Sequence, residues 1–141
     1  MIIEMSVQVR LPGVERLLHT LGDELDGAVV EAAKAVQAQA QVNAPVDTGA
    51  LRSSIYTVTA KGSGIGRSAA AASALRPGVG WVDVPWTVKR HEAVVAVGVS
   101  YGYWVENGAA GRAGRFYMAS AAAQHRPTFE RLVAAAVRRA T

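Results

Sequence analysis

The 141-residue sequence contains no cysteine, which excludes a disulfide framework, a thiolate zinc site and a cysteine nucleophile. It also lacks an apolar run close to the roughly 20 residues that a membrane-spanning helix needs. Its first ten residues, MIIEMSVQVR, place Glu4 inside their apolar stretch and carry no basic leader, so we do not expect a signal peptide. We therefore expect a soluble protein made in the cytoplasm, folded as one domain over residues 1–141 and without membrane contact.

Residues that could perform chemistry are few and isolated. The three histidines, at positions 19, 91 and 125, do not have metal-ligand spacing. The glycine-rich GSGIGRS lacks the Lys-Ser/Thr ending of a phosphate-binding loop. Asp47 has no histidine near it in sequence, and a helix-end hydrogen bond accounts for the lone Glu106 better than acid catalysis does. The sequence therefore predicts no catalytic residue, cofactor or metal; a hydrolase using Asp47 or Glu106 is the third of three hypotheses.

Acidic side chains become scarce after the first third of the chain. Residues 1–50 hold three basic and seven acidic side chains, whereas residues 51–141 hold twelve basic and four acidic ones. Flexible basic loops can contact phosphates through Coulombic attraction, without reading a base sequence. No helix-turn-helix, zinc finger or aromatic stacking platform accompanies them. A small basic DNA-binding protein without sequence specificity is thus the second hypothesis, and a solvated arginine-rich surface is the structural alternative.

Apolar periodicity predicts a short strand and then a long helix in the first third of the chain. MSVQVRL alternates apolar and polar residues and is ended by Pro12. From Val14 onward, apolar residues recur every three or four positions until Pro45, which stops the helix. A helix of about 30 residues would be about 45 Å long, which is long for a domain of this size.

The middle of the chain combines predicted strands with a low-complexity region. SSIYTVTA is rich in β-branched residues and predicts a strand. Residues 61–80 carry small side chains and only basic charges, so we expect a mobile basic loop or an extended hairpin. WVDV and WTVKRH predict short strands on either side of Pro85. EAVVAVGVS is the clearest strand: its large valines share one face, and the small residues of the other face would let a helix pack closely.

The last third of the chain predicts two helices separated by a loop. YGYWVENGA predicts a short helix with Tyr101, Trp104 and Val105 on one face, and AGRAGR predicts a loop. From Met118 the pattern is helical, with Pro127 splitting it. The order of elements predicts an α+β fold, in which a long N-terminal helix and a C-terminal helix pack on a small, mainly antiparallel β-sheet.

The stretch APVDTGALRSSI, residues 44–55, predicts a sharp corner between the long helix and the strand that follows. Asp47 or Thr48 would cap the turn through a side-chain oxygen. Gly49 would let the chain bend. The predicted structural corner therefore consists of Pro45, Asp47, Thr48 and Gly49.

After a long N-terminal helix, this corner resembles the hallmark of a family of tail-component or tail-completion proteins of long-tailed bacteriophages, encoded among the head–tail joining genes. Two further stretches resemble later motifs of the family: YGYWVENGA at 101–109 and GRFYMASA at 114–121. A C-terminal helix follows in both. The resemblance covers most of the chain, with residues 61–92 outside it.

The resemblance implies a structural virion protein of the neck, without catalytic activity, between the head connector and the tail tube. It would form a ring of identical subunits, six being the expected number, and would touch connector or head-closure and tail-tube proteins. DNA would pass through with weak, salt-sensitive contact. Residues expected at the DNA channel or an interface are Lys61, Arg67, Arg76, Arg112 and Arg115. Residues expected at an interface or in packing are Tyr101, Trp104, Glu106 and Phe116.

Overall fold

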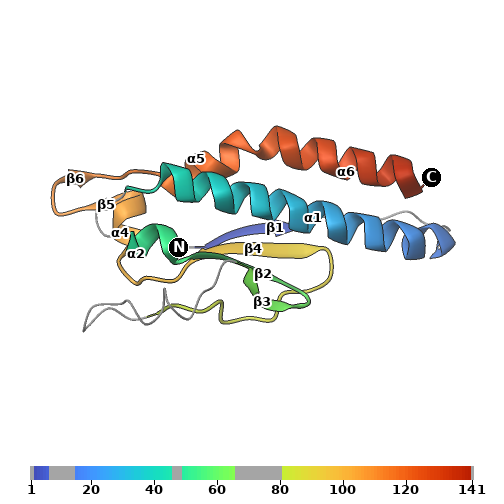
Figure 1. The fold of residues 1–141 in the computed structure, drawn as a ribbon, viewed down its shortest axis with the longest axis horizontal. Coiled ribbons are helices and arrows are strands. Elements are labelled where there is room, and N and C mark those ends of the chain that lie inside the picture. Colours follow the sequence, from blue (N-terminus) through green and yellow to red (C-terminus); the bar gives the residue numbers. More distant parts are fainter. Residues whose placement is uncertain (1, 7–14, 46–48, 66–80, 141) are drawn as a thin grey trace.

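A computed structural model describes residues 2–6, 15–45, 49–65 and 81–140, and it shows helices on one face of an antiparallel sheet (Figure 1). The elements are β1 (Ile2–Ser6), α1 (Glu15–Asn43), α2 (Ala50–Ser53), β2 (Ile55–Thr59), β3 (Gly62–Ile65), β4 (Glu92–Val97), α4 (Gly102–Asn107), β5 (Gly108–Ala109), β6 (Arg112–Ala113), α5 (Tyr117–Gln124) and α6 (Arg126–Ala140). This arrangement confirms the predicted α+β fold with long N-terminal and C-terminal helices. No helix in these ranges has the length and hydropathy of a membrane span.

The long helix α1 forms over almost the range that its apolar period predicts. Its buried positions recur every three or four residues, and three of them, Ala32, Ala33 and Ala40, are fully buried alanines. Alanine has the highest helix propensity and lets the helix backbone lie close to its neighbours. The helix ends at Asn43, two residues before Pro45, because proline disfavours helical geometry in the residue before it.

Strand β4 lies inside the four-stranded sheet, whose order is β1-β4-β2-β3. Its neighbours β1 and β2 both run antiparallel to it, with Ile55 opposite Val97 and Thr59 opposite Ala93. All described residues of β4 after Glu92 are buried, because both faces of the strand are covered. The sheet therefore contains the centre of the hydrophobic core.

The helix packs on the valine face of β4, and the expectation that it would use the small face was wrong. The valines at 95, 97 and 99 share one cluster with Val29 and Val36 of α1. The small residues that allow this approach come from the helix itself. The opposite face instead receives Trp81, whose ring would lie only 2.4 Å from a Cβ atom added at Gly98.

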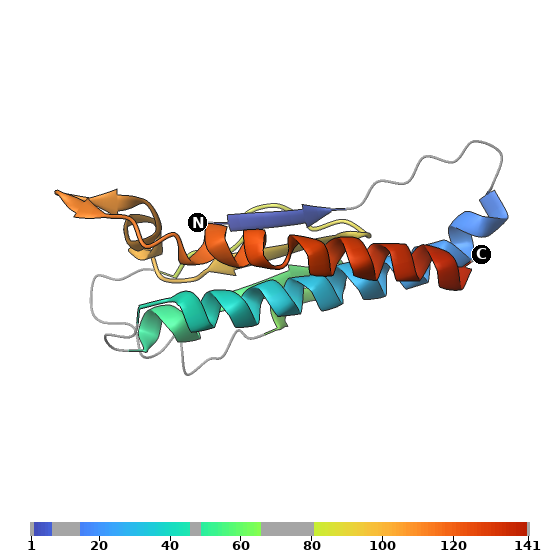
Figure 2. The ribbon, with the colours of Figure 1, turned by 90° about the horizontal axis from the view of Figure 1, so that it is seen from above.

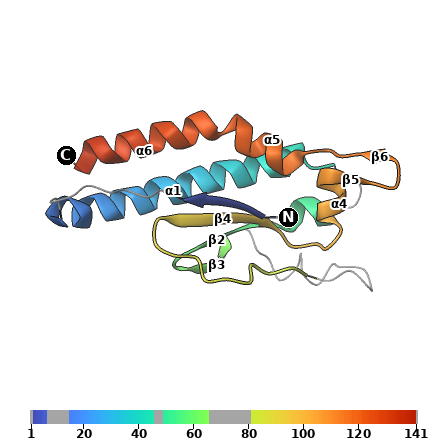
Figure 3. The same cartoon turned by 180° about the vertical axis from the view of Figure 1, so that it is seen from behind.

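The predicted strands on either side of Pro85 are not present. Trp81 forms one isolated bridge with Val99, and residues 82–91 belong to no strand. The segment instead crosses the sheet face opposite α1 (Figure 3). Trp81 stacks on Tyr56 with ring centroids 5.5 Å apart, and Val88 is buried against the same face of the sheet. The segment buries these side chains on the face of the sheet and therefore does not pair as a further strand at its edge. Pro85 also disfavours strand pairing, because proline has no N–H to donate to a neighbouring strand.

The two C-terminal helices lie along α1, with α6 beside it for most of its length (Figure 2). The break falls at His125, two residues before Pro127. Proline is tolerated there because the first N–H groups of a helix have no intrahelical acceptor. Leu132 and Val133 pack against buried residues of α1, whereas Val137 is partly exposed.

Three strand boundaries differ from those predicted. Strand β1 occupies Ile2–Ser6, so it overlaps the predicted strand only in Met5 and Ser6, and the rest of that strand lies outside the described residues. Strand β3 is paired with β2, which gives the first part of residues 61–80 the hairpin form of the prediction. The predicted loop AGRAGR, residues 110–115, contains the turn and the second strand of the hairpin β5–β6, and the first strand precedes it.

Candidate subunit interface

A groove of about 1010 Å³ opens where α1 turns into α2, and the hairpin β5–β6 borders it. The groove brings together residues of the predicted corner, of the predicted DNA-channel set and of the predicted interface set. Its described lining includes Pro45, Gly49, Leu51, Tyr101, Trp104, Val105, Arg112 and Arg115. Among the described residues that line it, none is a carboxylate. The groove is therefore apolar with basic side chains at one border.

Lys61 is not part of this groove. It follows β2, whose last residue Thr59 pairs with Ala93 at the start of β4. The groove lies near α4, which follows the other end of β4. Arg67, Arg76, Asp47 and Thr48 lie outside the described residues. Of the predicted basic residues that the structure describes, Arg112 and Arg115 line the groove at the corner and Lys61 does not.

Gly49 bends the chain with a φ angle of +76°, a conformation that residues with a Cβ rarely adopt. The single-turn helix α2 then intervenes before the strand, closed by hydrogen bonds from the N–H of Ser53 to the Gly49 carbonyl and from that of Ser54 to the Ala50 carbonyl. Gly49 itself occupies the N-cap position, where no side-chain cap bond forms. The amide of Gln37 donates to the Ile55 carbonyl over 3.2 Å, which ties α1 to the end of the corner.

The carboxylate of Glu106 is fully buried and holds the start of α5. Its Oε1 atom accepts hydrogen bonds from the backbone N–H groups of Met118, over 2.8 Å, and Ala119, over 3.4 Å. The N-cap residue of α5, Phe116, makes no side-chain cap bond. Glu106 therefore caps the helix from another element, where unpaired N–H groups and the helix dipole favour a negative charge. This is a helix-end bond of the kind expected for Glu106.

Tyr117 joins α5 to the start of α4. Its buried hydroxyl donates to the Gly102 carbonyl over 2.9 Å. Burial and the nearby carboxylate of Glu106 raise the pKa of Tyr117 far above its ordinary value. Gly102 is required by close packing, because an added Cβ would lie 2.5 Å from Val97 Cγ1. These contacts fix α4 against α5 and so fix the base of the hairpin between them.

The hairpin β5–β6 projects beyond the ends of the neighbouring helices (Figures 1 and 2). Its turn residues Ala110 and Gly111 both have positive φ, which is the pattern of the tight type I′ turn. Gly108 also has positive φ, and a Cβ there would lie 2.5 Å from the Arg112 carbonyl oxygen. The turn therefore holds two exposed arginines, Arg112 and Arg115, at the border of the groove.

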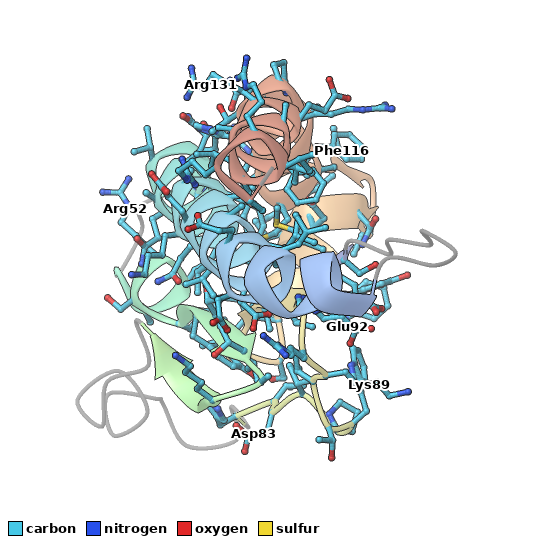
Figure 4. All side chains as sticks on the ribbon, turned by 90° about the vertical axis from the view of Figure 1, so that its right-hand side faces the viewer. Arg52, Asp83, Lys89, Glu92, Phe116 and Arg131 are labelled. Carbon is cyan, nitrogen blue, oxygen red and sulfur yellow. The ribbon has the colours of Figure 1, made fainter. Side chains whose placement is uncertain are left out.

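Three large aromatic side chains in α4 and just after the hairpin are exposed, and one of them, Trp104, lines the groove. Tyr103, Trp104 and Phe116 are 50%, 57% and 53% exposed, and the first two contact each other edge to face. Tyr101 and Val105 are partly buried against the core, and all three side chains of the predicted helix face, Tyr101, Trp104 and Val105, line the groove. Clustered exposed aromatic residues are typical of interaction sites. Figure 4 shows Phe116 on the outside of the ribbon.

The other candidate side chains make structural contacts. The N–H of His91 donates to Asp26 Oδ1 over 2.7 Å, and His125 lies between helices, 3.3 Å from Gln39 and from Thr128. Burial opposes ionisation of Asp26, but hydrogen bonds from Arg90 and from the His91 backbone outweigh it and hold the pKa of Asp26 below its ordinary value. Within the described ranges, no cluster of three His, Asp or Glu side chains could hold a metal.

The fold and the groove define a small α+β protein with an apolar surface groove next to exposed aromatic side chains. A family model described as "Bacteriophage HK97-gp10, putative tail-component" matches residues 13–108, including the corner, α4 and the region 61–92 that the motifs left out. Because this match spans more than half of the chain, the protein belongs to this family of phage tail components. No match was found among curated proteins or among solved structures.

Proposed function

We propose that this structural tail component is a ring-forming subunit of the phage neck, which completes the tail or joins it to the head. The observation that carries the proposal is the groove at the corner, an apolar surface bordered by the exposed ring of Trp104 and by two arginines, which one copy leaves open. A soluble monomer has little reason to leave such a surface uncovered. An assembly of copies would cover it.

A ring follows from the kind of contact that this surface permits. The groove is at one end of the molecule, so a neighbour that fills it with a different part of its surface makes a heterologous contact. Repeating such a contact by rotation produces a closed ring when the angles allow closure. The preferred number of subunits is six, with the connector or head-closure protein on one side and the tail tube on the other. DNA passes through the centre.

The protein acts by assembly and carries out no reaction in this proposal. Glu106, the residue named in the hydrolase hypothesis, has its carboxylate occupied by the N-terminus of α5 and is shielded from solvent. The corner sets α1 against the sheet, and α4 with the hairpin presents the groove. Genomic DNA meets exposed arginines only weakly, because tight binding would hinder its passage.

Among the described residues, the exposed arginines of the hairpin and of α6, such as Arg131 (Figure 4), favour the second candidate, a basic DNA-binding protein. Two other arginines form surface ion pairs with carboxylates of α1. Arg139 pairs with Glu24, and Arg90 pairs with Asp23 and Asp26. The charge imbalance along the chain is therefore partly cancelled by contacts between its two parts.

Native mass spectrometry and a salt series of DNA binding distinguish the two candidates. We expect a single closed oligomer and DNA binding that disappears as salt is raised through the physiological range. A monomer whose DNA affinity persists at that salt would support the second candidate instead. The same measurement on the neck fraction of purified virions covers the case in which the ring closes only on its neighbours.

A further inference from the structure

We infer that the sheets of neighbouring copies join edge to edge, with strand β1 of one copy pairing antiparallel with strand β3 of the next. The inference rests on the proposed function and adds to it a backbone joint that does not use the corner groove. It follows from the direction of the strands, from their register, and from the surface beside β1.

The two outermost strands of the described sheet are β1 and β3, because the strand order is β1-β4-β2-β3. An edge strand presents N–H and C=O groups that its own sheet does not pair, and a strand of another chain can pair with them. Natural sheets often prevent this with proline or several charges on the edge. Ile2–Ser6 contains one charged residue, Gly62–Ile65 contains none, and neither contains proline. The sequences of both strands are therefore compatible with pairing between copies.

The strand directions fit a heterologous joint. Strands β1 and β2 run antiparallel to β4, and β3 runs antiparallel to β2, so β1 and β3 run in opposite directions. A copy rotated about an axis along the strands therefore places its β3 antiparallel beside the β1 of the first copy. The helices of both copies then lie on the same face of the joined sheet. Repeating this contact around the axis closes a ring.

The register places two opposite charges beside each other at the joint. The pairings inside one sheet put four residues at the same level across its strands: Glu4, Val94, Val58 and Ser63. In a joint that continues this level, Ser63 of the next copy lies opposite Glu4, and Lys61 of the next copy lies diagonal to Glu4. Glu4 and Lys61 are both exposed. Opposite charges at diagonal positions stabilise strand pairing.

The surface beside β1 has room for an added strand. A groove of about 440 Å³ lies between β1 and the helices α5 and α6, and Figure 2 shows β1 on that side of the sheet. Its described lining includes the apolar residues Met5, Val36 and Phe129, with Ala122 and Ala123 of α5. The sequence of β3, Gly-Ser-Gly-Ile, has three small residues that permit close approach to these alanines and one apolar residue that matches the lining. A strand of this composition fits beside β1.

Cysteine cross-linking tests the joint, because the chain has no cysteine of its own. Glu4→Cys combined with Ser63→Cys should give a ladder of covalent multimers when assembled protein is oxidised. Within one copy these positions are three strand spacings apart, about 14 Å, which is too far for a disulfide. Closing a ring of strands can stagger the joint by two residues, and Glu4→Cys with Lys61→Cys then gives the ladder instead.

A double variant of matched design is the control for the cross-linking. Glu4→Cys combined with Lys34→Cys, on the exposed side of α1, should give no ladder, and each single variant should stay largely monomeric after denaturation. Efficient dimer formation by Glu4→Cys alone, without a ladder in the double variants, would show that β1 pairs with β1 and would overturn the inference.

The same cross-linking is performed on purified particles. Closed rings without a ladder from either double variant would place the joint elsewhere and overturn the inference, while the proposed function would stand. If neither preparation contained an oligomer of this chain, the proposed function itself would fail, and the inference with it.

Charge reversal is a second test of the joint. Glu4→Lys alone and Lys61→Glu alone should each raise the concentration needed for assembly at least threefold, because like charges then meet at every joint, and combining them should restore most of it. Glu31→Lys, the same change on the exposed side of α1, is the matched control and should leave assembly unchanged. Thermal unfolding shows whether each variant is folded. A double variant that assembles no better than the single ones would show that the two side chains do not meet, and would overturn the inference.

Discussion

The carboxylate of Glu106 links two elements that the sequence separates by twelve residues. At the scale of single residues, this bond decides where the hairpin stands, because the N–H of Phe116 also donates to the Glu106 carbonyl over 3.1 Å. The motif stretches around 101–109 and 114–121 thus meet at one buried side chain. Removing that side chain would leave buried N–H groups without an acceptor.

We predict that Glu106→Ala lowers the free energy of unfolding by about 2–3 kcal/mol, since it leaves donors unsatisfied and a small void. Glu106→Gln keeps an acceptor oxygen and should cost about 1 kcal/mol. Urea unfolding of the two variants beside the wild type measures both changes. Equal and negligible costs would contradict the capping role.

Tyr117 should make the protein sensitive to alkali. The folded pKa of Tyr117 is raised, so above about pH 10, where an unfolded tyrosine ionises, the unfolded state releases a proton that the folded state keeps. Stability is therefore complete below about pH 10 and falls as the pH rises, by up to about 1.4 kcal/mol per pH unit. In Tyr117→Phe this part of the fall should vanish, as measured by unfolding at pH 9 to 11. An unchanged slope would assign the fall to other groups.

Gly49→Val should destabilise the corner enough to give unfolded or insoluble protein, because a β-branched residue is strained at a φ of +76°. Gly27→Ala is the matched control. Gly27 lies within α1, is exposed, and has no atom within 4 Å of an added Cβ, so alanine there should stabilise by about 0.5–1 kcal/mol. Thermal melting of both variants tests the contrast, and a normal melting temperature for Gly49→Val would refute the strained corner.

At the scale of elements, the sequence predicts what depends on local pattern. The period of α1, the β-branched run of β2 and the stop after α4 each appear close to their expected place. What it missed depends on competition between distant partners. The ring of Trp81 packs against Gly98 on the sheet face opposite α1, so the segment after Trp81 leaves the sheet. The small hairpin depends on positive φ angles at Ala110 and Gly111, which the identities of these two residues do not reveal.

The sequence singles out several residues of the groove but does not predict that they lie together in the fold. The corner, Trp104 and the two arginines were each singled out, yet sequence alone does not show that they line one surface. The course of the segment Trp81–Trp86 over the face of the sheet was missed because its alternating apolar residues resemble a strand. The signal that could have identified it is the combination of Pro85 with two tryptophans.

Asp26 fastens the turn before β4 to α1 through Arg90 and the His91 backbone. The pKa of Asp26 is lowered in the fold, so this contribution is present above the unfolded pKa of about 4 and is lost as the pH falls below it. Asp26→Asn should therefore cost up to about 1 kcal/mol at pH 7, less at high salt, and almost nothing at pH 3. Denaturant titrations at the two pH values check this. A cost that does not change with pH would show that charge is unimportant there.

At the scale of the whole molecule, the chain carries a net charge of +4, yet its ends differ in character. At the end where α6 finishes, oppositely charged side chains pair, as Arg139 does with Glu24. The other end carries the groove, where the described lining residues include two arginines and no carboxylate. This polarity suits a subunit that joins neighbours through two different surfaces, and it explains why net charge alone gives little support to DNA binding.

The central claim is that copies of this chain form a ring in the neck, and electron cryomicroscopy of the neck in purified particles of the encoding phage tests it most directly. The account predicts a closed ring of copies of this chain between the head connector and the tail tube, with the corner groove of each copy in contact with the next. A neck whose side-chain density contains no copy of this chain, or contains copies that do not touch one another, would contradict it.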